Sequence, residues 1–529
     1  MPQPKSVYLR PNVIIEPLVD RWYAWPHLIS PATAARNITE RHLKIMASYV
    51  EAPHFHAAAA RNPSMKGGPF MDYGSDRSTE VRALIDVTNR VRAPSIALSH
   101  ALADLDRLLA DRARGGPLAP LYADMPEVLK GFVELHYDRS NHPGFRLVEP
   151  LLYRAFGDGP ASQSLYLSLG SGIRPFMMST PRLAEPNEAL LPLPFDHVGV
   201  DVLFELFRSP RPLEELGEIA GLGASLLARL SPFVTEQPPA RAPAAPGRGS
   251  RWRYFGHACV LLEAPGCAIL LDPAIKTADD DGEGGFDDTH LPDRIDYVLL
   301  THNHQDHVLL ETLLRLRHRI GAIVVPRSGS GALEDPSLRL VLVSLGFRNV
   351  MELDEFESIE AEGVSITAAP FLGEHGDLAI RSKAIWHIRI SERRLLFAAD
   401  CKNLSPALFR KVRDAIGTVD TLFLGMECDG APMSWIYGPL FASPPQREHD
   451  QTRRLAGCDF EEAVELVEIF APGHVYVYAM GMEAWLNYIM ATRYTPESNP
   501  IVASQKLVDA CRDRGLQAER LYGAREVAL

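Results

Sequence analysis

The sequence lacks any long apolar segment. Across its 529 residues, no run approaches the roughly 18 consecutive apolar residues that a membrane-spanning helix requires. The opening residues, MPQPKSVYLRPNVIIEPLVD, also lack the long apolar core of a secretory signal peptide. We therefore expect no membrane partner and a cytoplasmic location.

Cysteine and basic residues are also scarce. The six cysteines are dispersed and form no CxxC pair, which argues against a disulfide framework or a structural zinc knuckle. Lysine and arginine number 54 against 67 aspartates and glutamates, so the formal net charge is −13. Without a basic excess to meet phosphates, we expect no nucleic-acid partner.

A stretch rich in proline and alanine divides the chain. The total length implies two or three domains, at roughly 100–200 residues per domain. The segment 235–250, TEQPPARAPAAPGRGS, carries no large apolar side chain, which is typical of an extended linker. We predict an N-terminal α/β domain over residues 1–235, a linker over 236–250 and a second domain over 251–529.

The N-terminal part shows helix and strand patterns but little chemistry. Leucines at helical spacing predict a helix over residues 95–112, and apolar positions predict another from Pro126 onward. Residues 164–170 alternate as a strand does. His54 and His56 stand at HxH spacing, but without a second cluster such a pair is more often a packing or surface feature.

The second part has a different organisation. RYFGHACVLLEAPGCAILLDPA predicts two strands joined by a turn, and IDYVLL predicts a short buried strand. VLLETLLRLRHRI and SPALFRKVRDAIG predict helices, while AIWHIRI and RLLFAAD predict a hairpin. Strands in runs, with helices inserted between pairs, indicate two packed sheets with helices outside.

One short motif carries the chemistry. THNHQDH places His302, His304, Asp306 and His307 where the buried strand ends and a helix begins. Imidazole and carboxylate together suit zinc, iron or manganese, and one ion cannot easily use all four residues of so tight a loop. The spacing therefore favours a site for two metal ions. The alternative is that these residues are only the polar start of a helix, with Asp306 as its N-cap.

A two-metal site needs ligands from elsewhere in the chain. Asp400 ends the apolar strand RLLFAAD, where an unpaired carboxylate is costly, so we interpret it as a bridging ligand rather than a helix cap. The stretch GEHGDL offers Glu374 or His375. His474, beside the apolar stretch VYVYAMG, is a further candidate ligand or supporting residue, with a core or loop role as the alternative.

The motif and its surroundings resemble a known superfamily. THNHQDH has the HxHxDH form of the metallo-β-lactamase superfamily, and FGHACVLLE with AILLDP resembles its first hairpin. The resemblance covers about residues 251–490 and implies an αββα sandwich with the site at one edge. Most members are zinc hydrolases that use a metal-bound hydroxide.

The whole chain resembles a narrower group, the metallo-β-lactamase-fold diiron β-hydroxylases that include the chloramphenicol-biosynthesis enzyme. The similarity lies in the length, the large N-terminal domain, the loop motif and LGMECDGAPMSWIYGPL. It implies a non-haem diiron monooxygenase of antibiotic biosynthesis. Its substrate would be the β-carbon of an aminoacyl group, an aromatic one such as p-aminophenylalanine, tethered to a carrier domain of a nonribosomal peptide synthetase.

The same resemblance implies ligands, cofactors and partners. Two irons would be held by the loop and two carboxylates: His302, His304, Asp306, His307, Glu374 and Asp400. Dioxygen would be the co-substrate, and an external donor such as a reductase or ferredoxin would supply electrons. The N-terminal domain would serve homodimerisation and carrier docking. Trp435 and Tyr437 are candidates for an aromatic substrate pocket, with a plain core role equally open.

One position separates this interpretation from its main alternative. Two histidines with Glu374 form a face suited to non-haem iron that activates oxygen. If His375 points inward instead, the ligand set becomes that of a zinc hydrolase, for example a thioesterase. A binding or scaffold protein with a relic metal site is a third hypothesis, which the complete ligand set disfavours.

Overall fold

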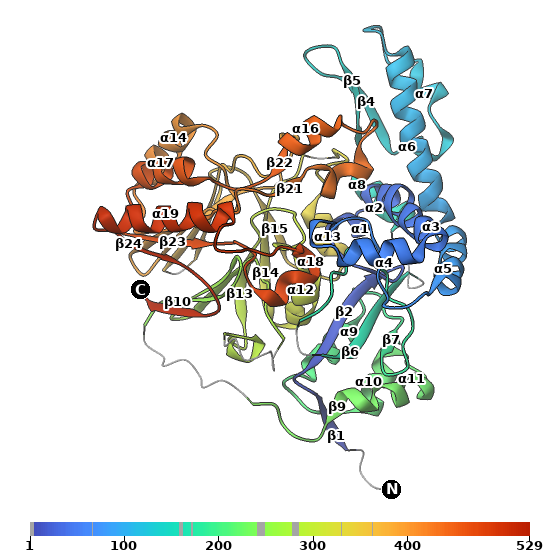
Figure 1. Cartoon of the computed structure of the whole chain (residues 1–529), viewed down its shortest axis with the longest axis horizontal. Coiled ribbons are helices and arrows are strands. Elements are labelled where there is room, and N and C mark those ends of the chain that lie inside the picture. The colour runs from blue at the N-terminus through green and yellow to red at the C-terminus, as the bar shows by residue number, and fades with distance from the viewer. Residues whose placement is uncertain are drawn as a thin grey trace.

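Two seven-stranded β-sheets form the centre of the molecule (Figure 1). The computed structural model describes residues 5–65, 67–157, 162–170, 173–240, 249–277, 285–329, 331–361 and 363–529. Residues 241–248 of the expected linker lie outside the described residues, and the domain boundaries stay a prediction. Among the described helices, none combines the length and the apolar character needed to cross a membrane.

The first sheet combines parallel and antiparallel pairs. Its central strands are the apolar segments expected from the sequence, and the four strands from β12 to β15 are parallel. The order is β15 (Val350–Leu353), β14 (Ile320–Pro326), β13 (Ile295–Leu299), β12 (Cys267–Leu271), β11 (Cys259–Ala264), β10 (Arg251–Gly256) and β25 (Arg525–Ala528).

The second sheet packs on the first through a shared apolar core. Trp252 of the first sheet and Trp386, Phe397 and Phe423 of the second belong to one buried cluster. Its order is β16 (Ser358–Ala361), β17 (Val364–Ala369), β18 (Ile385–Ile390), β19 (Arg393–Phe397), β20 (Thr421–Gly425), β23 (His474–Tyr478) and β24 (Gln517–Arg520).

Helices cover the outer faces of both sheets. The second sheet is covered by α14 (Pro406–Ile416), α17 (Phe460–Phe470) and α19 (Asn499–Asp513), which share an apolar cluster with it (Figure 1). The first sheet is covered by α12 (Leu310–Leu316) and α13 (Leu338–Ser344). This αββα sandwich confirms the fold class expected from the sequence.

The N-terminal part builds smaller sheets surrounded by helices. A four-stranded antiparallel sheet has the order β3 (Trp22–Tyr23), β2 (Val13–Val19), β6 (Gln163–Leu169) and β7 (Ala189–Leu191). A separate three-stranded antiparallel sheet has the order β8 (Arg211–Pro212), β1 (Ser6–Leu9) and β9 (Val234–Thr235). The helices are α1 (Pro26–Ile29), α2 (Pro31–Asn37), α3 (Leu43–Glu51), α4 (Pro53–Arg61), α5 (Ser78–Val91), α6 (Ala93–Arg112), α7 (Leu121–Asp124), α8 (Glu149–Phe156), α9 (Val198–Glu205), α10 (Leu213–Ala220) and α11 (Ala224–Leu230).

Most local predictions for this part are confirmed. The helix at 95–112 is α6 and the strand at 164–170 is β6. The helix expected from Pro126 is wrong, because a short 3-10 turn leads through Gly131 (φ 84°) into β4 (Val133–Tyr137). β4 pairs with β5 (Pro143–Leu147) in a hairpin, and its residues alternate between buried and exposed as a strand's do.

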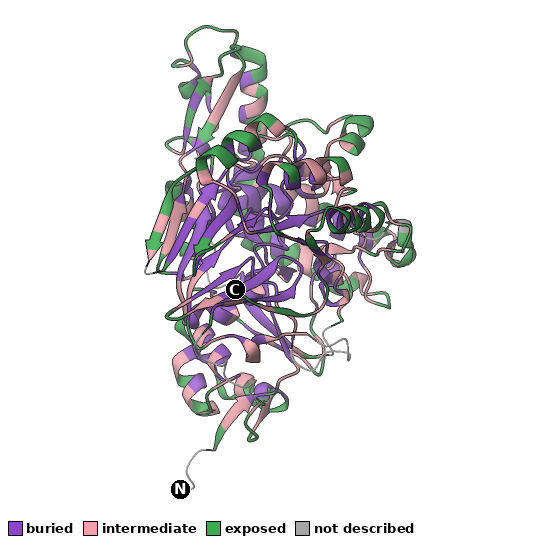
Figure 2. Ribbon diagram, turned by 90° about the vertical axis from the view of Figure 1, so that its left-hand side faces the viewer, coloured by how far each residue is buried: buried purple, intermediate pink, exposed green. Residues whose placement is uncertain are grey.

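Burial is concentrated in the central sheets. Figure 2 shows buried residues in purple across both sheets, while the arm formed by α6 and the β4–β5 hairpin is largely exposed or half-buried. The two sheets therefore form the buried core, and the loops that leave their strand ends are anchored in it.

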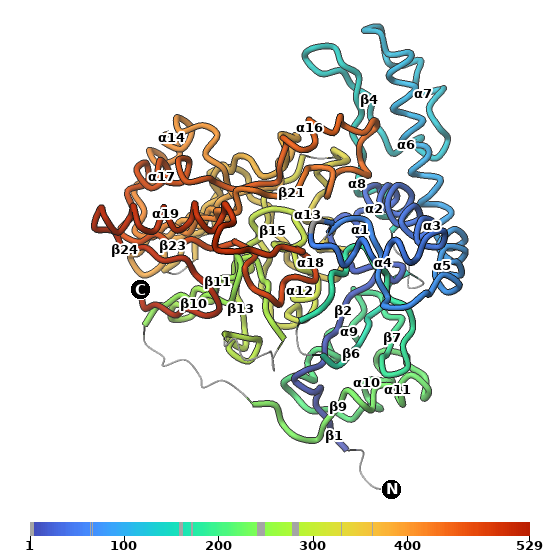
Figure 3. The backbone as a smooth tube through the Cα atoms, in the orientation of Figure 1, coloured from blue at the N-terminus to red at the C-terminus, as the bar shows by residue number. Residues whose placement is uncertain are grey.

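The N-terminal part packs directly against the sandwich. One apolar cluster joins Leu28 of α1, Leu310 of α12 and Tyr437 of α15 (Ser434–Tyr437). Tyr23 also meets the ring of Tyr488 in α18 (Asn487–Met490), and Figure 3 shows the blue N-terminal helices beside this late segment. Elements distant in sequence thus meet around the loop that follows β13.

Short elements complete the late part of the sandwich. They connect the second sheet to the N-terminal part and carry several residues of the cavity described below. They are β21 (Ala431–Pro432), α16 (Arg447–Thr452) and β22 (Arg454–Leu455), with β21 and β22 paired in an antiparallel ladder.

Candidate metal centre

The loop that follows β13 is buried along its whole motif. The chain leaves the apolar strand before Thr301 and begins α12 at Leu310. His302 and His307 have no exposed surface, and His304 and Asp306 are buried as well. Imidazoles and carboxylates in such a place are costly unless they find partners, so other strands must supply them.

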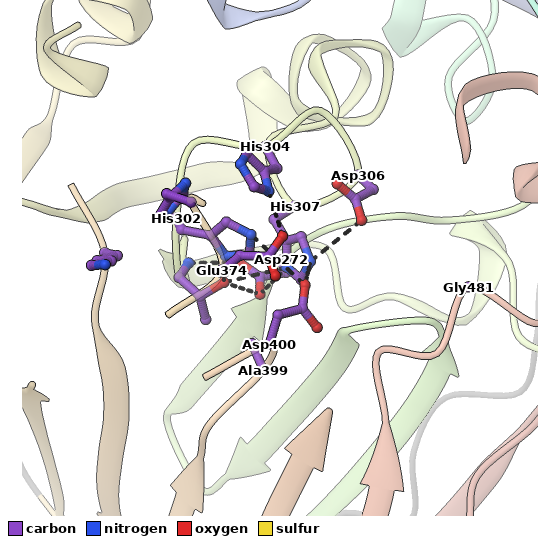
Figure 4. Close-up of polar contacts among 12 residues, drawn as sticks. Asp272, His302, His304, Asp306, His307, Glu374, Ala399, Asp400 and Gly481 are labelled. Carbon is purple, nitrogen blue, oxygen red and sulfur yellow. Dashed lines mark hydrogen bonds and ion pairs between the residues drawn. The ribbon is translucent and has the colours of Figure 1, made fainter. Parts of the chain in front are cut away.

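Those partners come from places where the chain turns sharply. At the ends of β12 and β19, Asp272 and Ala399 have left-handed backbones with φ of 36° and 37°, and Glu374 has φ of 67°. In non-glycine residues such conformations cost about 1–3 kcal/mol each and tend to occur at functional sites. The turns bring Asp272, Glu374 and Asp400 to the histidine loop (Figure 4).

Two groups of possible ligands share His302. One contains His304 and Glu374, the other His307 and Asp400, and the ligand atoms within each group lie within 4.8 Å of one another. Nδ1 of His304 is 2.9 Å from Oε1 of Glu374. Nε2 of His307 is 2.9 Å from Oδ2 of Asp400. Two adjoining sites of mixed imidazole and carboxylate character result.

Hydrogen bonds decide which ring nitrogens are free. Nδ1 of His307 donates to Oδ2 of Asp272 at 2.9 Å, which leaves Nε2, 2.9 Å from Oδ2 of Asp400, as the nitrogen that a metal cation would bind in place of a proton. Thr301 Oγ1 donates to the same Asp272 oxygen at 2.7 Å and accepts from Nδ1 of His302 at 3.0 Å. Nε2 of His302 is therefore also free, and it is buried without a hydrogen-bond partner in the described structure, as is Oδ1 of Asp400.

The cluster gathers more negative charge than its histidines can balance. Burial, together with Asp400 and Asp306, raises the pKa of Glu374 well above its ordinary value. Burial opposes a proton on His307, yet Asp306 and Asp400 raise the pKa of this imidazole well above its ordinary value. Lone pairs and carboxylates that converge in a dry site fit metal cations, which neutralise both.

Asp306 belongs to a third group with His257 and His307. The backbone N–H of Gly481 donates to Nδ1 of His257 at 3.2 Å, so the ring proton of a neutral His257 lies on Nε2. Nε2 donates it to Oδ2 of Asp306 at 3.1 Å. His257 therefore orients Asp306 instead of competing with it for a metal.

Tyr437 supports His304 and lies outside the cavity described next. Its side chain is fully buried, and its hydroxyl lies 3.2 Å from Nε2 of His304 and 2.8 Å from Nδ1 of His375. The hydroxyl therefore links the two imidazoles and is placed to orient His304. A role for Tyr437 in the substrate pocket stays a prediction, since the contacts of its hydroxyl are to His304 and His375.

A cavity of about 380 Å³ opens onto the cluster. Trp435 lines it and also a neighbouring cavity of about 850 Å³ beside α2 and α3, as expected of a pocket residue. The indole N–H of Trp435 donates to the carbonyl of Gly67 at 2.7 Å. From the cluster and its surroundings, the smaller cavity is lined by His257, His304, Asp306, Glu374, Asp400 and Glu427.

Two other predicted histidines lie outside the three groups. His474 is the first residue of β23, whereas the site lies at the opposite end of that strand, where Ala479 donates its N–H to the carbonyl of His257. His474 is therefore too far along the strand to act as a ligand or supporting residue. His375 is fully buried beside His304, and its Nε2 has no hydrogen-bond partner in the described structure.

Sequence reasoning missed His257 and Asp272. Both follow apolar strands, in FGHACV and AILLDP, and both are fully buried. A polar residue that closes a buried strand is the signal that identified Asp400, and it applies equally to these two. The isolated pair His54 and His56 belongs to α4, where His56 bonds Ser48 and Met71 and serves packing.

Known proteins match the chain along its length. The diiron non-heme β-hydroxylase N-terminal domain matches residues 8–238, and the β-lactamase superfamily domain matches residues 269–477. The 4-amino-L-phenylalanyl-[CmlP-peptidyl-carrier-protein] 3-hydroxylase of Streptomyces venezuelae is 40% identical over 533 residues, which covers 98% of this chain and 99% of that protein.

Solved structures agree with this match. The crystal structure of CmlA, a diiron β-hydroxylase from Streptomyces venezuelae, superposes with a TM-score of 0.93 at 38% identity and covers 100% of both chains. A CmlA variant with one glutamate replaced by aspartate has a TM-score of 0.91 at 38% identity, and the match covers 99% of this chain and 100% of that one.

Proposed function

Because this chain belongs to the diiron non-heme β-hydroxylase family, we propose that it acts on an aromatic aminoacyl group carried as a thioester by a peptidyl carrier protein. The chain is an oxygen-dependent monooxygenase with a two-iron cofactor. The Streptomyces venezuelae relative is named for a 4-amino-L-phenylalanyl group on such a carrier, and the same substrate class is proposed here. The observation that carries the substrate class is the 40% identity to this relative over 98% of the chain, while the buried, adjoining groups of imidazole and carboxylate support the two-iron cofactor.

The proposal extends to the ligands of the two irons. The histidines and carboxylates that converge at the ends of the strands would hold both ions. One iron would be held by His302, His304 and Glu374, the other by Asp306 and His307, with Asp400 between them. The supporting observation is that Nδ1 of His304 and Nε2 of His307 each lie 2.9 Å from a carboxylate oxygen inside the protein.

The placement of the two side chains supports Glu374 over His375 as a ligand. Glu374 forms one group of possible ligands with His302 and His304, and its Oε1 lies 2.9 Å from Nδ1 of His304. Among the described residues, His375 belongs to none of the three groups. A set of two histidines and one carboxylate results, which suits iron that activates oxygen.

When bound, the two irons supply the oxygen activation and the electron transfer of the reaction. The protein positions the substrate and keeps water away from the reacting carbon. Burial of the histidine loop provides the dry environment, while Asp272 and His257 hold His307 and Asp306 in fixed orientations. The hydroxylation consumes dioxygen, a pair of electrons from an external donor and a pair of protons, and releases water.

Metal analysis combined with a product assay tests the proposal. Protein purified without added metal should contain two irons per chain in a coupled cluster by Mössbauer spectroscopy. With reductant, dioxygen and a 4-aminophenylalanyl carrier protein, the aminoacyl group should gain the mass of one oxygen atom. Zinc in place of iron, together with hydrolysis of the thioester, would contradict the proposal and favour a hydrolase.

Two partners and the location also belong to the proposal. We propose a homodimer, electron delivery by a ferredoxin or its reductase, and a cytoplasmic site of action. Light scattering on the purified protein measures the oligomeric state directly. A monomeric mass at micromolar concentration would contradict the dimer without affecting the proposed reaction.

Replacing Tyr437 by phenylalanine should weaken iron binding. The substitution removes the hydroxyl that is hydrogen-bonded to His304 and keeps the packed ring. Loss of such an orienting contact typically costs about 10–100-fold in metal affinity or activity. Iron affinity, measured by competition with a chelator, checks this expectation. The matched control is Tyr476→Phe, since Tyr476 lies in the apolar core between the sheets, and it should leave iron affinity unchanged.

A further inference from the structure

Glu427 brings an additional carboxylate to the cavity beside the metal centre. It follows β20 by two residues and lines the same cavity as Glu374 and Asp400. It belongs to none of the three groups of possible metal ligands among the described residues. The proposed iron ligands therefore leave this carboxylate without an assigned role.

Neutral hydrogen bonds hold the Glu427 carboxylate in place. Oε2 accepts from the backbone N–H of Gly430 at 2.5 Å, and Oε1 accepts from the Tyr494 hydroxyl at 3.3 Å. Gly430 has φ of 56°, and a Cβ there would lie 1.9 Å from the carbonyl oxygen of Leu455, so the turn requires glycine. The local fold thus fixes the carboxylate where the cavity meets the loop.

The surroundings of Glu427 favour a cation. Arg493 lines the same cavity, but among the described residues no lysine, arginine or histidine forms an ion pair with Glu427, and Asp400 and Asp429 add negative charge nearby. Burial and these neighbours raise the pKa of Glu427 to about 7. A positively charged group that entered the cavity would be stabilised by the carboxylate and would keep it ionised.

An aminoacyl thioester brings such a cation to a fixed distance from its reacting carbon. Its α-ammonium group is bonded to the α-carbon, which is bonded to the β-carbon that is hydroxylated. An anchor for the ammonium therefore also sets the position of the β-carbon. Glu427 lines the same cavity as Asp400 and Glu374, so a substrate anchored there would hold its β-carbon in the cavity that opens onto the metal centre.

We propose that Glu427 binds the α-ammonium group of the aminoacyl substrate and selects aminoacyl over des-amino acyl groups. The inference rests on the proposed function, because the substrate class comes from it. Tyr494 and the N–H of Gly430 are positioning groups, since they act through the carboxylate. A charge-assisted contact of this kind is expected to favour the aminoacyl group by about 10–100-fold.

Equilibrium binding of two loaded carriers tests the inference. The CmlP peptidyl carrier protein is loaded either with 4-aminophenylalanine or with 3-(4-aminophenyl)propanoate, which lacks only the α-amino group. The wild type should prefer the first by about 10–100-fold. Glu427→Gln should reduce the preference to within a few-fold by weakening the aminoacyl carrier alone. Glu427→Asp, which keeps a carboxylate, should retain part of it.

Asp509→Asn is the matched control. It removes the same charge from an exposed residue of α19 whose carboxylate accepts from Gln505 outside the cavity, so the preference should persist. Iron content and melting temperature of each variant establish that the fold is intact. An unchanged preference in Glu427→Gln, or an equal loss of affinity for both carriers, would overturn the inference. Failure of the wild type to hydroxylate would overturn the proposed function, while the binding preference would still decide the role of Glu427.

Discussion

Glu374→Gln is expected to lower turnover to about one-thousandth of the wild-type value or less, which corresponds to about 4 kcal/mol of lost transition-state stabilisation. The amide that replaces the carboxylate beside His304 carries no negative charge and is a weaker ligand for iron. Iron content should fall toward one ion per chain, because the Asp306 and His307 side keeps its own ligands. Metal analysis and the oxygen-transfer assay together measure both effects.

His375→Asn is the matched control for this experiment. His375 is the next residue, is equally buried, and bonds only the Tyr437 hydroxyl through Nδ1. If Glu374 is the ligand, the His375 variant should keep both irons and most of its activity. The reverse pattern, with iron lost only in the His375 variant, would refute the assignment and would restore the ligand set of a zinc hydrolase.

Arg174→Met is expected to lower the melting temperature by roughly 3–5 °C, because it leaves the partly buried Glu311 carboxylate without its cation, whereas Glu16 keeps Arg182. The Arg174 guanidinium bonds Glu16 of β2 at 3.1 Å and Glu311 of α12 at 2.9 Å. It also lies 3.5 Å from the centre of the Tyr488 ring. The side chain thus fastens the N-terminal sheet to the helix that follows the histidine loop, and its loss should also reduce iron retention.

A double variant separates charge from packing. In Arg174→Met/Glu311→Gln one uncompensated carboxylate is removed, so the melting temperature should recover part of the loss. Arg139→Met, on the exposed hairpin arm, controls for the substitution itself and should leave the melting temperature unchanged. Equal melting temperatures for the single and double variants would show that buried charge is not the cause. Scanning calorimetry measures all four proteins.

The sequence by itself determined the features that depend on local spacing. HxHxDH after an apolar strand identified the loop, because three histidines and an aspartate within six residues have few structural explanations. The strand that ends in Asp400 was recognised because a carboxylate there is costly without a partner. The same patterns, with the resemblance they carry, sufficed for the αββα class. The local pattern gave a wrong prediction after Pro126, where the apolar spacing suits a helix. In the structure Gly131 turns the chain, and the alternating burial at Val133 and Leu135 is that of a strand.

Only the tertiary structure decided which side chains complete the site. Asp272 reaches His307 across 35 residues, Tyr437 reaches His304 across 133, and Gly481 reaches His257 across 224. No local pattern encodes such contacts, since they depend on how strands order within the sheets and on where each chain turn points. The tautomers of the histidines, the burial of Tyr437 and the place of Glu427 in the cavity follow from that packing. Short segments of the sequence therefore determine which residue types are available to bind metals. The orientation of those side chains is determined only when strand ends that are distant in sequence come together in the fold.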